Sequence, residues 1–440
     1  MRRVIPLLST MALTLLVASG VALAGAIGSA GAQGSVVGPG ESIQKAVNAA
    51  HPGDTIMVRG VHREDVVIRK DGIKLRGEDA VIEAPARADS PCSKTFGPEA
   101  ICVLGDVNIE TGKLEGQRVS DVSVSGFTIR GFKIAGQSDK DAFVIDVTDA
   151  RNTTVVGNHA TTGNVPGGIF TGASINTTIA NNEVTGNLGR DAPGIDVDTG
   201  SRNTKIVNNV VRNYVFGMDV DETTNATITG NDLIGNSVTG IGVVDSPGTK
   251  ILSNDVSRSG VVGAFMAGPK QANAKVVGNN ISGGPFGIYV ADTKGGGSIA
   301  GNTVRNNCAG MFFDASPAQP LGGFEVKANT VENNTRSCRV GQFDRDFSGI
   351  GIALLGATDM EVMGNQISGN VPSGPTPVSG GVVVSTDPYG RSNTPKPMNN
   401  SVTGNHFGRN KPDNFWDESG SGNRFVGNLC DTSVPSSLCN

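Results

Sequence analysis

Two short acidic segments, Gly-Ile-Asp-Val-Asp and Gly-Met-Asp-Val-Asp, carry the side chains best suited to chemistry. The first contributes Asp196 and Asp198, and the second, 23 residues later, contributes Asp219 and Asp221. Side chains two residues apart on a strand point to the same face. Paired carboxyl groups hydrolyse glycosidic bonds, and clustered carboxylates bind Ca²⁺. We predict a catalytic role for these four residues, with Ca²⁺ ligation as the alternative role and a solvated strand face as the purely structural interpretation.

Asp196 and Asp219 occupy the x position of a repeated Gly-apolar-x-apolar segment. Five further residues occupy the same position, namely Asp146, Phe170, Phe265, Tyr289 and Phe312, although the segment that contains Asp146 lacks the Gly. Aromatic rings beside carboxylates suit the binding of sugar rings, so we predict that this set contacts a substrate. The alternative is cross-strand packing of the aromatic rings beneath a loop.

An internal repeat predicts the elements that position these residues. The Gly-apolar-x-apolar segment begins at Gly168, Gly194, Gly217, Gly240, Gly263, Gly287 and Gly310, at intervals of 23 to 26 residues. An Asn-x-apolar pattern recurs between these segments, with its first Asn at 158, 182, 208, 231, 254, 279, 302, 329, 365 and 405. We expect the side chains of these Asn residues to bond from coil to coil as a structural ladder. A third short strand precedes each Asn. We therefore predict an all-β fold, a right-handed parallel β-helix with about three strands per coil.

The two ends of the chain carry different signals. Residues 1–32 resemble a signal peptide cleaved after Ala24 or Ala32, which predicts a secreted protein with no transmembrane segment once the signal is removed. The β-helix domain then covers residues 33–440. Apolar residues at helical spacing, Ile43, Ala46 and Val47 among them, predict a short capping helix within about residues 37–52. Residues 428–440 are expected to close the other end as a disulfide-bonded tail.

Six cysteines in an exported chain indicate disulfides. The spacing and the repeat favour three pairs, Cys92 with Cys102, Cys308 with Cys338, and Cys430 with Cys439. Without the signal the formal charge is 34 − 41 = −7, which argues against a nucleic-acid partner. Two long coils, Asn333–Gly349 and Ser385–Met398, are expected to project as loops, where function often resides.

The repeats resemble those of the pectate-lyase-like β-helix superfamily. The segment GDTIMVRGVHREDVVIRKDGIKLRGEDAVI is similar to the first coils of bacterial β-helix proteins. The GIxV and TxIxxNxVxxN repeats are similar to carbohydrate-binding and sugar-hydrolase repeats, which also occur in NosD-like accessory proteins for copper sites. The resemblance spans roughly residues 37–428. The Asn-Thr-Asp, Asp-Asp, Gly-His-Gly and Asp-Pro-His-Asp motifs of the enzyme families are absent, so no catalytic residue can be transferred.

Three functions remain open from the sequence. The chain is either a polysaccharide lyase or glycoside hydrolase, or a non-catalytic structural or surface β-helix that binds glycan. A NosD-like metal-site accessory is the third possibility, although the His and Met clustering that it requires is weak. Carboxylates beside aromatic rings on a rigid face favour a polysaccharide or cell-surface glycan as the partner.

Overall fold

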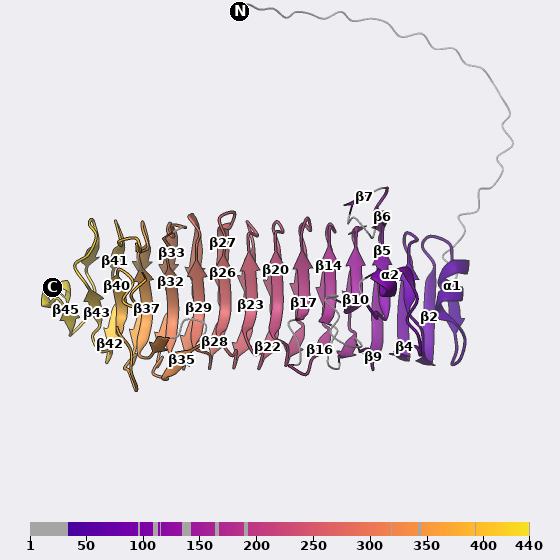
Figure 1. Cartoon of the computed structure of the whole chain (residues 1–440), viewed down its shortest axis with the longest axis horizontal. Coiled ribbons are helices and arrows are strands. Elements are labelled where there is room, and N and C mark those ends of the chain that lie inside the picture. The colour runs from indigo at the N-terminus through magenta and orange to yellow at the C-terminus, as the bar shows by residue number, and fades with distance from the viewer. Residues whose placement is uncertain are drawn as a thin grey trace, which may run out of the picture.

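The computed structural model describes residues 34–95, 97–108, 113–114, 116–133, 142–162, 167–188, 192–317, 319–341, 345–391 and 393–439. The predicted signal peptide and residues 343 and 344 of one long coil lie outside the described residues. Successive strands pair in parallel with the strands one coil before and one coil after them, which builds the elongated stack of Figure 1. The predicted parallel β-helix is confirmed.

Each regular coil contributes three strands, and the strands of successive coils form columns. The first column is a sheet of its own: β3 (Val66–Ile68), β5 (Ile101–Leu104), β10 (Phe143–Thr148), β14 (Gly167–Gly172), β17 (Pro193–Asp198), β20 (Phe216–Asp221), β23 (Thr239–Val244), β26 (Val262–Ala267), β29 (Phe286–Ala291), β32 (Ala309–Asp314), β37 (Ile350–Leu355), β40 (Gly380–Ser385), β43 (Asn414–Trp416) and β45 (Ser433–Val434). We call it the site sheet.

The other two columns form one continuous sheet because its first long strands run along both. The strands that begin this sheet are β1 (Gly34–Val37), β2 (Thr55–His62), β4 (Lys74–Glu83) and β9 (Ser123–Arg130). The second column continues with β12 (Thr154–Val156), β15 (Thr178–Ala180), β18 (Lys205–Val207), β21 (Thr227–Thr229), β24 (Lys250–Leu252), β27 (Ala272–Val277), β30 (Gly295–Ala300), β33 (Phe324–Lys327), β38 (Glu361–Met363), β41 (Ser401–Thr403) and β44 (Arg424–Val426). The third continues with β13 (His159–Thr161), β16 (Glu183–Thr185), β19 (Val210–Arg212), β22 (Asp232–Ile234), β25 (Asp255–Ser257), β28 (Asn280–Ser282), β31 (Thr303–Arg305), β34 (Thr330–Glu332), β39 (Gln366–Ser368) and β42 (His406–Gly408).

The interior of the coil is filled by the alternating apolar residues of all three columns. In one coil Ile195, Ile206 and Val211 point inward and are completely buried. Corners between strands are made by residues with positive φ, many of them Asn, because Asn tolerates the left-handed conformation. The repeat therefore supplies both the core and the turns.

A buried ladder of Asn side chains lies between the second and third columns. Asn231 Nδ2 donates to Asn254 Oδ1 at 2.9 Å, and Asn254 Nδ2 donates to Asn279 Oδ1 at 2.9 Å. The predicted member Asn208 is wrong, because the ladder uses Asn209. Val211 is the inward residue of that strand, so the ladder position two residues before it is Asn209, while Asn208 adopts the positive φ of the corner.

Both ends of the stack are covered. The expected N-terminal helix is present as α1 (Ile43–Ala49), which starts after the cap Ser42 and buries Ile43 and Val47. At the other end the 3₁₀-helix η1 (Ser436–Cys439) closes the tail, and the Cys430–Cys439 disulfide is formed. Within the described residues, no helix has the length and apolar composition needed to span a bilayer.

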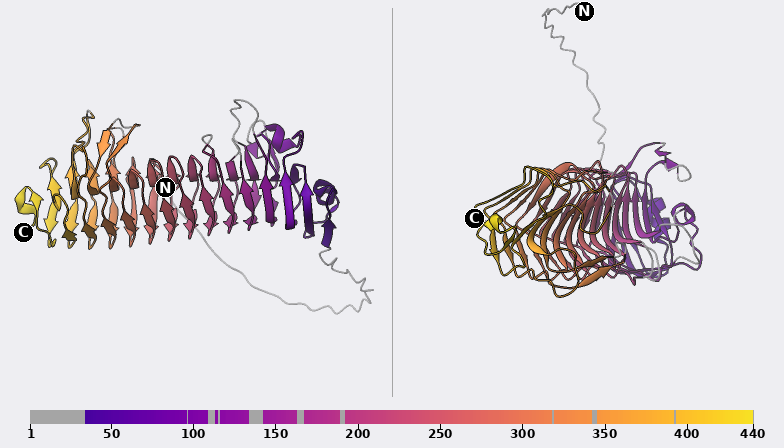
Figure 2. Two further views of the ribbon diagram at one scale, coloured as in Figure 1. Left: turned by 90° about the horizontal axis from the view of Figure 1, so that it is seen from below. Right: turned by 60° about the vertical axis from the view of Figure 1, so that its left-hand side comes forward.

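Several described segments project from the stack. They are α2 (Pro91–Thr95), the pair β6 (Val107–Asn108) and β7 (Lys113–Leu114), and the hairpin β35 (Cys338–Val340) and β36 (Arg345–Phe347). The parallel pair β8 (Val119–Ser120) and β11 (Ala150–Arg151) instead lies at a corner of the stack, and single bridges continue it from Arg151 into the following coils. Figure 2 shows projections rising from one side of the stack near both of its ends. The Cys92–Cys102 disulfide ties α2 to β5, and the Cys308–Cys338 disulfide ties the hairpin to the coil of β32. All three expected disulfides are therefore present.

Candidate functional site

The predicted site residues lie in one row of neighbouring outward positions on the site sheet. Strand pairing places Asp146 beside Phe170, Phe170 beside Asp196, and Asp196 beside Asp219. The row continues through Gly242, Phe265, Tyr289 and Phe312. We call this row the central row. The repeat therefore predicted the order of these residues, whereas their burial depends on segments outside the repeat.

A second row of outward positions runs beside the central row, two residues further along each strand. The pairing of Val197 with Val220 places Asp198 beside Asp221 on adjacent strands. Gly172 precedes Asp198 in this row, and Val244 follows Asp221. Asp196, Asp198, Asp219 and Asp221 thus form a two-by-two group, which we call the acidic patch. All four side chains are partly exposed.

Asp219 lies in a markedly different environment from an ordinary surface carboxylate. Burial, together with the charges of Asp221 and Asp198, raises its pKa to about 7, and the hydrogen bond from the backbone N–H of Val220 opposes the shift. Burial, together with repulsion from Asp198 and Glu222, raises the pKa of Asp221 to about 6. The patch therefore holds protons at a pH where isolated Asp side chains have lost theirs.

Hydrogen bonds orient a third member of the patch. The N–H of Thr199 donates to Asp198 Oδ1 at 2.5 Å, and the Thr199 hydroxyl donates to the same oxygen at 2.8 Å. Asp221 differs, because its Oδ1 is buried and has no hydrogen-bond partner among the described residues. Sequence reasoning missed Glu222 and Asp245, which add negative charge at the neighbouring corner.

The carboxylates of the acidic patch do not converge in this conformation, and the alternative role in Ca²⁺ ligation stays a prediction. In the described part of the chain, no three carboxylates of the patch bring ligand oxygens within 4.8 Å of one another. One group, Cys92, Glu99 and Cys102, meets that distance, but its two sulfurs form a disulfide. The patch spreads its carboxylates along two flat strands, whereas a Ca²⁺ site needs oxygens that converge on one point.

Partly exposed aromatic rings stand on both sides of the acidic patch in the central row. Phe170 precedes Asp196 and rests against Phe143, with ring centroids 5.2 Å apart. On the other side Gly242 is buried and separates Asp219 from Phe265 in the row. The carboxyl group of Asp219 occupies the space that a side chain at Gly242 would fill, since a Cβ atom there would lie 2.7 Å from Asp219 Oδ1. The middle of the central row thus combines carboxyl groups with two flanking rings.

Three of the predicted substrate contacts are buried and cannot touch a ligand in this conformation. Tyr289 and Phe312 are 7% and 3% exposed, because Phe347 and Tyr389 from the projecting segments pack on their row. Phe312 and Phe347 meet edge to face at 5.7 Å. Asp146 is 2% exposed. For these three residues the prediction of direct substrate contact is corrected, and packing beneath loops is the better interpretation.

Asp146 lies instead near a second buried carboxyl group, Glu99, which sequence reasoning did not find. Burial raises the pKa of Asp146 to about 7, although the Thr148 hydroxyl donates to it at 2.6 Å. The neighbouring Glu99 is 1% exposed, and its carboxylate oxygens have no hydrogen-bond partner among the described residues. Burial and the charge of Asp146 raise the pKa of Glu99 well above its ordinary value.

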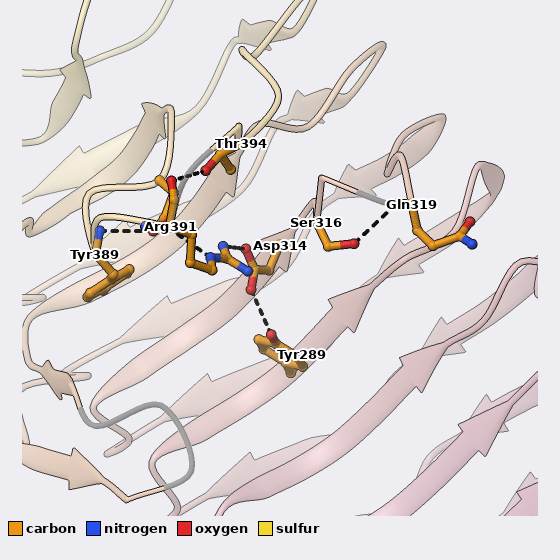
Figure 3. A network of polar contacts seen from close by, with 8 residues as sticks. Tyr289, Asp314, Ser316, Gln319, Tyr389, Arg391 and Thr394 are labelled. Carbon is orange, nitrogen blue, oxygen red and sulfur yellow. Dashed lines mark hydrogen bonds and ion pairs between the residues drawn. The ribbon is translucent and has the colours of Figure 1, made fainter.

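A charged network ties the long coil Ser385–Met398 to the site sheet, as Figure 3 shows. Arg391 forms an ion pair with Asp314 and a second one with Asp387 at 2.8 Å. The Tyr289 hydroxyl donates to Asp314 Oδ2 at 2.8 Å. Burial raises the pKa of Asp314, and Arg391 opposes the shift. Asp314 follows Gly310 by four residues, as Asp198 follows Gly194, so the repeat contained a signal for its position.

The fold and the row of outward carboxyl and aromatic side chains define a right-handed parallel β-helix of the kind built from stacked repeats. The sequence matches the family model described as right handed beta helix region over residues 99–256 and 220–394. These matches cover more than half of the chain, which therefore belongs to this family. No curated protein matches the sequence.

The chain is similar to solved structures of several kinds of protein. The catalytic unit of a thermostable GH87 alpha-1,3-glucanase from Streptomyces thermodiastaticus is 14% identical, covers 93% of this chain and 70% of its own, and has a TM-score of 0.50. PfbA, a surface adhesin of Streptococcus pneumoniae, is 14% identical, covers 87% of both chains, and has a TM-score of 0.50. The periplasmic alginate epimerase AlgG is 14% identical, covers 90% of this chain and 83% of its own, and has a TM-score of 0.45. At such identity the likeness shows the fold alone.

Proposed function

We propose that this chain is a secreted glycoside hydrolase that binds polysaccharide along the middle of the central row and cleaves it at the acidic patch. The observation that carries the proposal is the arrangement Phe170, Asp196, Asp219, Gly242, Phe265 on five successive strands. It places two rings on either side of the carboxyl groups along one line, while projecting segments cover the same sheet towards both ends. The three disulfides support export to an oxidising compartment.

The proposed chemistry uses two carboxyl groups in different protonation states. Asp219, with a pKa of about 7, is the general acid and donates its proton to the leaving glycosidic oxygen. Asp198, oriented by Thr199, accepts a proton from the attacking water. The C–O bond to the leaving sugar breaks as the bond from the water oxygen to the anomeric carbon forms. Asp196 and Asp221 take no part in these proton transfers. Both place negative charge beside the positive charge that develops on the sugar.

Strand geometry indicates the stereochemical outcome. Neighbouring strands lie about 4.8 Å apart and side chains two residues apart about 6.6 Å, so Asp198 and Asp219 stand diagonally at roughly 8 Å. Carboxyl groups separated by roughly 6.5 to 9.5 Å leave room for the water of an inverting hydrolase. We therefore expect inversion of the anomeric configuration.

The first prediction tests the general acid. Asp219→Asn should lower the rate of reducing-end release on the polysaccharide that a panel screen selects by at least about 100-fold. The wild-type rate should fall as the pH rises through about 7, because Asp219 must carry a proton. Asp255→Asn, on the third column and away from the site sheet, is the matched control and should keep the wild-type rate.

Other outcomes would redirect the assignment. Release of unsaturated uronates, detected by absorbance, would identify a lyase and contradict the hydrolytic mechanism. Binding of polysaccharide without any cleavage, unchanged by Asp219→Asn, would support a non-catalytic surface β-helix instead.

A further inference from the structure

Negative charge extends beyond the acidic patch to the corner that follows β20 and β23. Strand pairing places Asp221 beside Val244 on the next strand. The residues that follow them, Glu222 and Asp245, both adopt positive φ and occupy the same corner on adjacent coils. Glu222 is exposed and Asp245 is partly exposed, and Lys270 pairs with Glu222 at 3.2 Å in contact with solvent. Together with the patch, three successive coils therefore carry six carboxyl groups that solvent reaches.

The carboxyl group of Asp221 lacks partners that would stabilise its charge. Its Oδ1 has no hydrogen-bond partner among the described residues. Burial, together with repulsion from Asp198, Glu222 and Asp245, raises its pKa to about 6. The Asp221 side chain as a whole is partly exposed, so a ligand can approach it from solvent. A positive charge on that ligand would relieve the repulsion.

Three partly exposed rings lie around the acidic patch, where they can contact the uncharged part of a ligand. Phe170 and Phe265 stand on either side of the patch in the central row. Phe216 begins β20, the strand that also carries Asp219 and Asp221, and its ring is partly exposed. Flat apolar rings favour a ligand that has apolar faces of its own, as sugar rings do.

Charge and spacing together limit the type of ligand. A chain of uronic acids would add negative charge and be repelled. A single Ca²⁺ ion needs oxygens that converge on one point, whereas these carboxyl groups are spread over three coils. A chain with separate ammonium groups along its length matches that spread, and sugar rings between the ammonium groups match the phenylalanine side chains. At a pH below about 7, where Asp219 holds its proton, primary amines are protonated.

We propose that the polysaccharide is a polymer of amino sugars whose amino groups are not acetylated, and that Asp221, Glu222 and Asp245 bind its ammonium groups. This substrate class rests on the hydrolase function proposed above. The three carboxyl groups form an ammonium subsite beside the cleavage point, and the sugar rings lie against the exposed phenylalanine side chains.

Calorimetry on the mature Asp219→Asn protein at pH 6 measures binding without turnover. The probes are oligosaccharides of glucosamine, of N-acetylglucosamine and of glucose, equal in length. At low ionic strength the glucosamine oligosaccharide should bind at least about tenfold more tightly than the other two, and added salt should reduce this difference. Its binding should also release protons, which titrations in two buffers of different ionisation enthalpy detect, because an ammonium group beside Asp221 favours the ionised carboxylate.

Two pairs of substitutions test the position of the ammonium subsite. Adding Glu222→Gln and Asp245→Asn should weaken the binding of the glucosamine oligosaccharide about tenfold and leave the binding of the glucose oligosaccharide unchanged. Asp232→Asn with Asp255→Asn is the matched control, because these two carboxyl groups also lie on adjacent strands, β22 and β25, but in the third column. The control pair removes the same charge and should keep the preference for glucosamine.

The possible outcomes separate this inference from the proposed function. Equal affinity for the glucosamine and glucose oligosaccharides would overturn the amino-sugar class even if the wild-type protein hydrolyses a glycan. Binding without proton release, or an equal loss of binding in the two pairs of variants, would overturn the position of the subsite. Oligolysine that binds as tightly as the glucosamine oligosaccharide would contradict a sugar site. Selective binding of the glucosamine oligosaccharide, without its cleavage by the wild-type protein, would support the ammonium subsite and refute the hydrolase.

Discussion

At the scale of single residues, burial separates carboxyl groups that look equivalent in the sequence. Asp146 and Asp219 occupy the same row of the site sheet, and burial raises the pKa of each to about 7. Asp219 remains partly exposed, whereas Asp146 is closed off and lies near Glu99. The same perturbation thus marks a candidate catalytic acid in one place and a stability cost in the other.

The second prediction concerns the pH dependence of stability. The pKa of Asp146 is higher in the folded state than in the unfolded chain, where it is about 3.9. The protonated form therefore stabilises the fold below pH about 4, and this contribution is lost as the pH rises through about 7. Asp146→Asn should raise the free energy of unfolding at pH 8 by roughly 1 to 4 kcal/mol and change it little at pH 4.

Urea denaturation at both pH values would measure this effect. Asp255→Asn, an exposed substitution on β25, controls for the loss of one negative charge and should show no such difference between the two pH values. Equal stability of wild type and Asp146→Asn at pH 8 would contradict the raised pKa.

At the scale of elements, the projecting coils decide which part of the site sheet meets solvent. The hairpin β35–β36 and the long coil with Tyr389 and Arg391 cover Tyr289 and Phe312, and the Cys308–Cys338 disulfide ties the hairpin to the stack. Arg391 fastens the long coil through Asp314 and Asp387. The aromatic row is therefore open at Phe265 and closed from Tyr289 onward.

The third prediction tests this fastening. Arg391→Gln should lower the free energy of unfolding by about 1 to 3 kcal/mol, because it leaves the buried carboxylate of Asp314 without its cationic partner. Limited proteolysis should show faster cleavage within residues 386–391, and urea denaturation should show the loss of stability. Adding Asp314→Asn should restore most of it by removing the buried charge.

Arg339→Gln provides the matched control for the loss of an ion pair. Arg339 pairs with Asp346 at 3.2 Å, but Arg339 is exposed and Asp346 is partly exposed, and pairs that solvent reaches contribute little. A similar loss of stability in Arg339→Gln and Arg391→Gln would mean that burial of Asp314 does not decide the effect.

At the scale of the whole molecule, stability is transmitted from coil to coil through backbone pairing and the Asn ladder. Asn254 illustrates the arrangement. Its Oδ1 accepts from the N–H and the side-chain amide of Asn231, and its own amide donates to Ile228 O and Asn279 Oδ1. Each ladder residue thus joins three coils, so an interruption affects more than one repeat.

The fourth prediction tests the ladder. Asn254→Ala should lower the free energy of unfolding by about 3 kcal/mol or more, because buried groups on Asn231 and Ile228 lose their partners. Asn280→Ala, whose partly exposed side chain bonds Asp255 at 3.2 Å, should lower it by less than about 0.5 kcal/mol. Thermal denaturation of both variants would compare them, and equal effects would contradict a special role of the buried ladder.

Spacing and alternation along the chain were enough to predict the features that depend on the period of the repeat. The order Asp146, Phe170, Asp196, Asp219 in one row, the capping helix at Ile43–Ala49 and the disulfide pairs all followed from spacing and alternation. Strand alternation and parallel stacking are local rules, so a residue's place in the repeat predicts its neighbours in space. The ladder position Asn208 was wrong by one residue because the repeat offers two adjacent asparagines.

Only the tertiary structure decided which of those residues meet solvent and which groups converge. Tyr289 and Phe312 are covered by Phe347 and Tyr389, which belong to coils later in the chain. The insertions that carry these two side chains do not follow the period of the repeat. The failure of the patch carboxylates to converge on a cation site likewise depends on side-chain directions on a flat sheet. Burial and convergence arise from contacts between distant segments, and a one-dimensional pattern carries no record of those contacts.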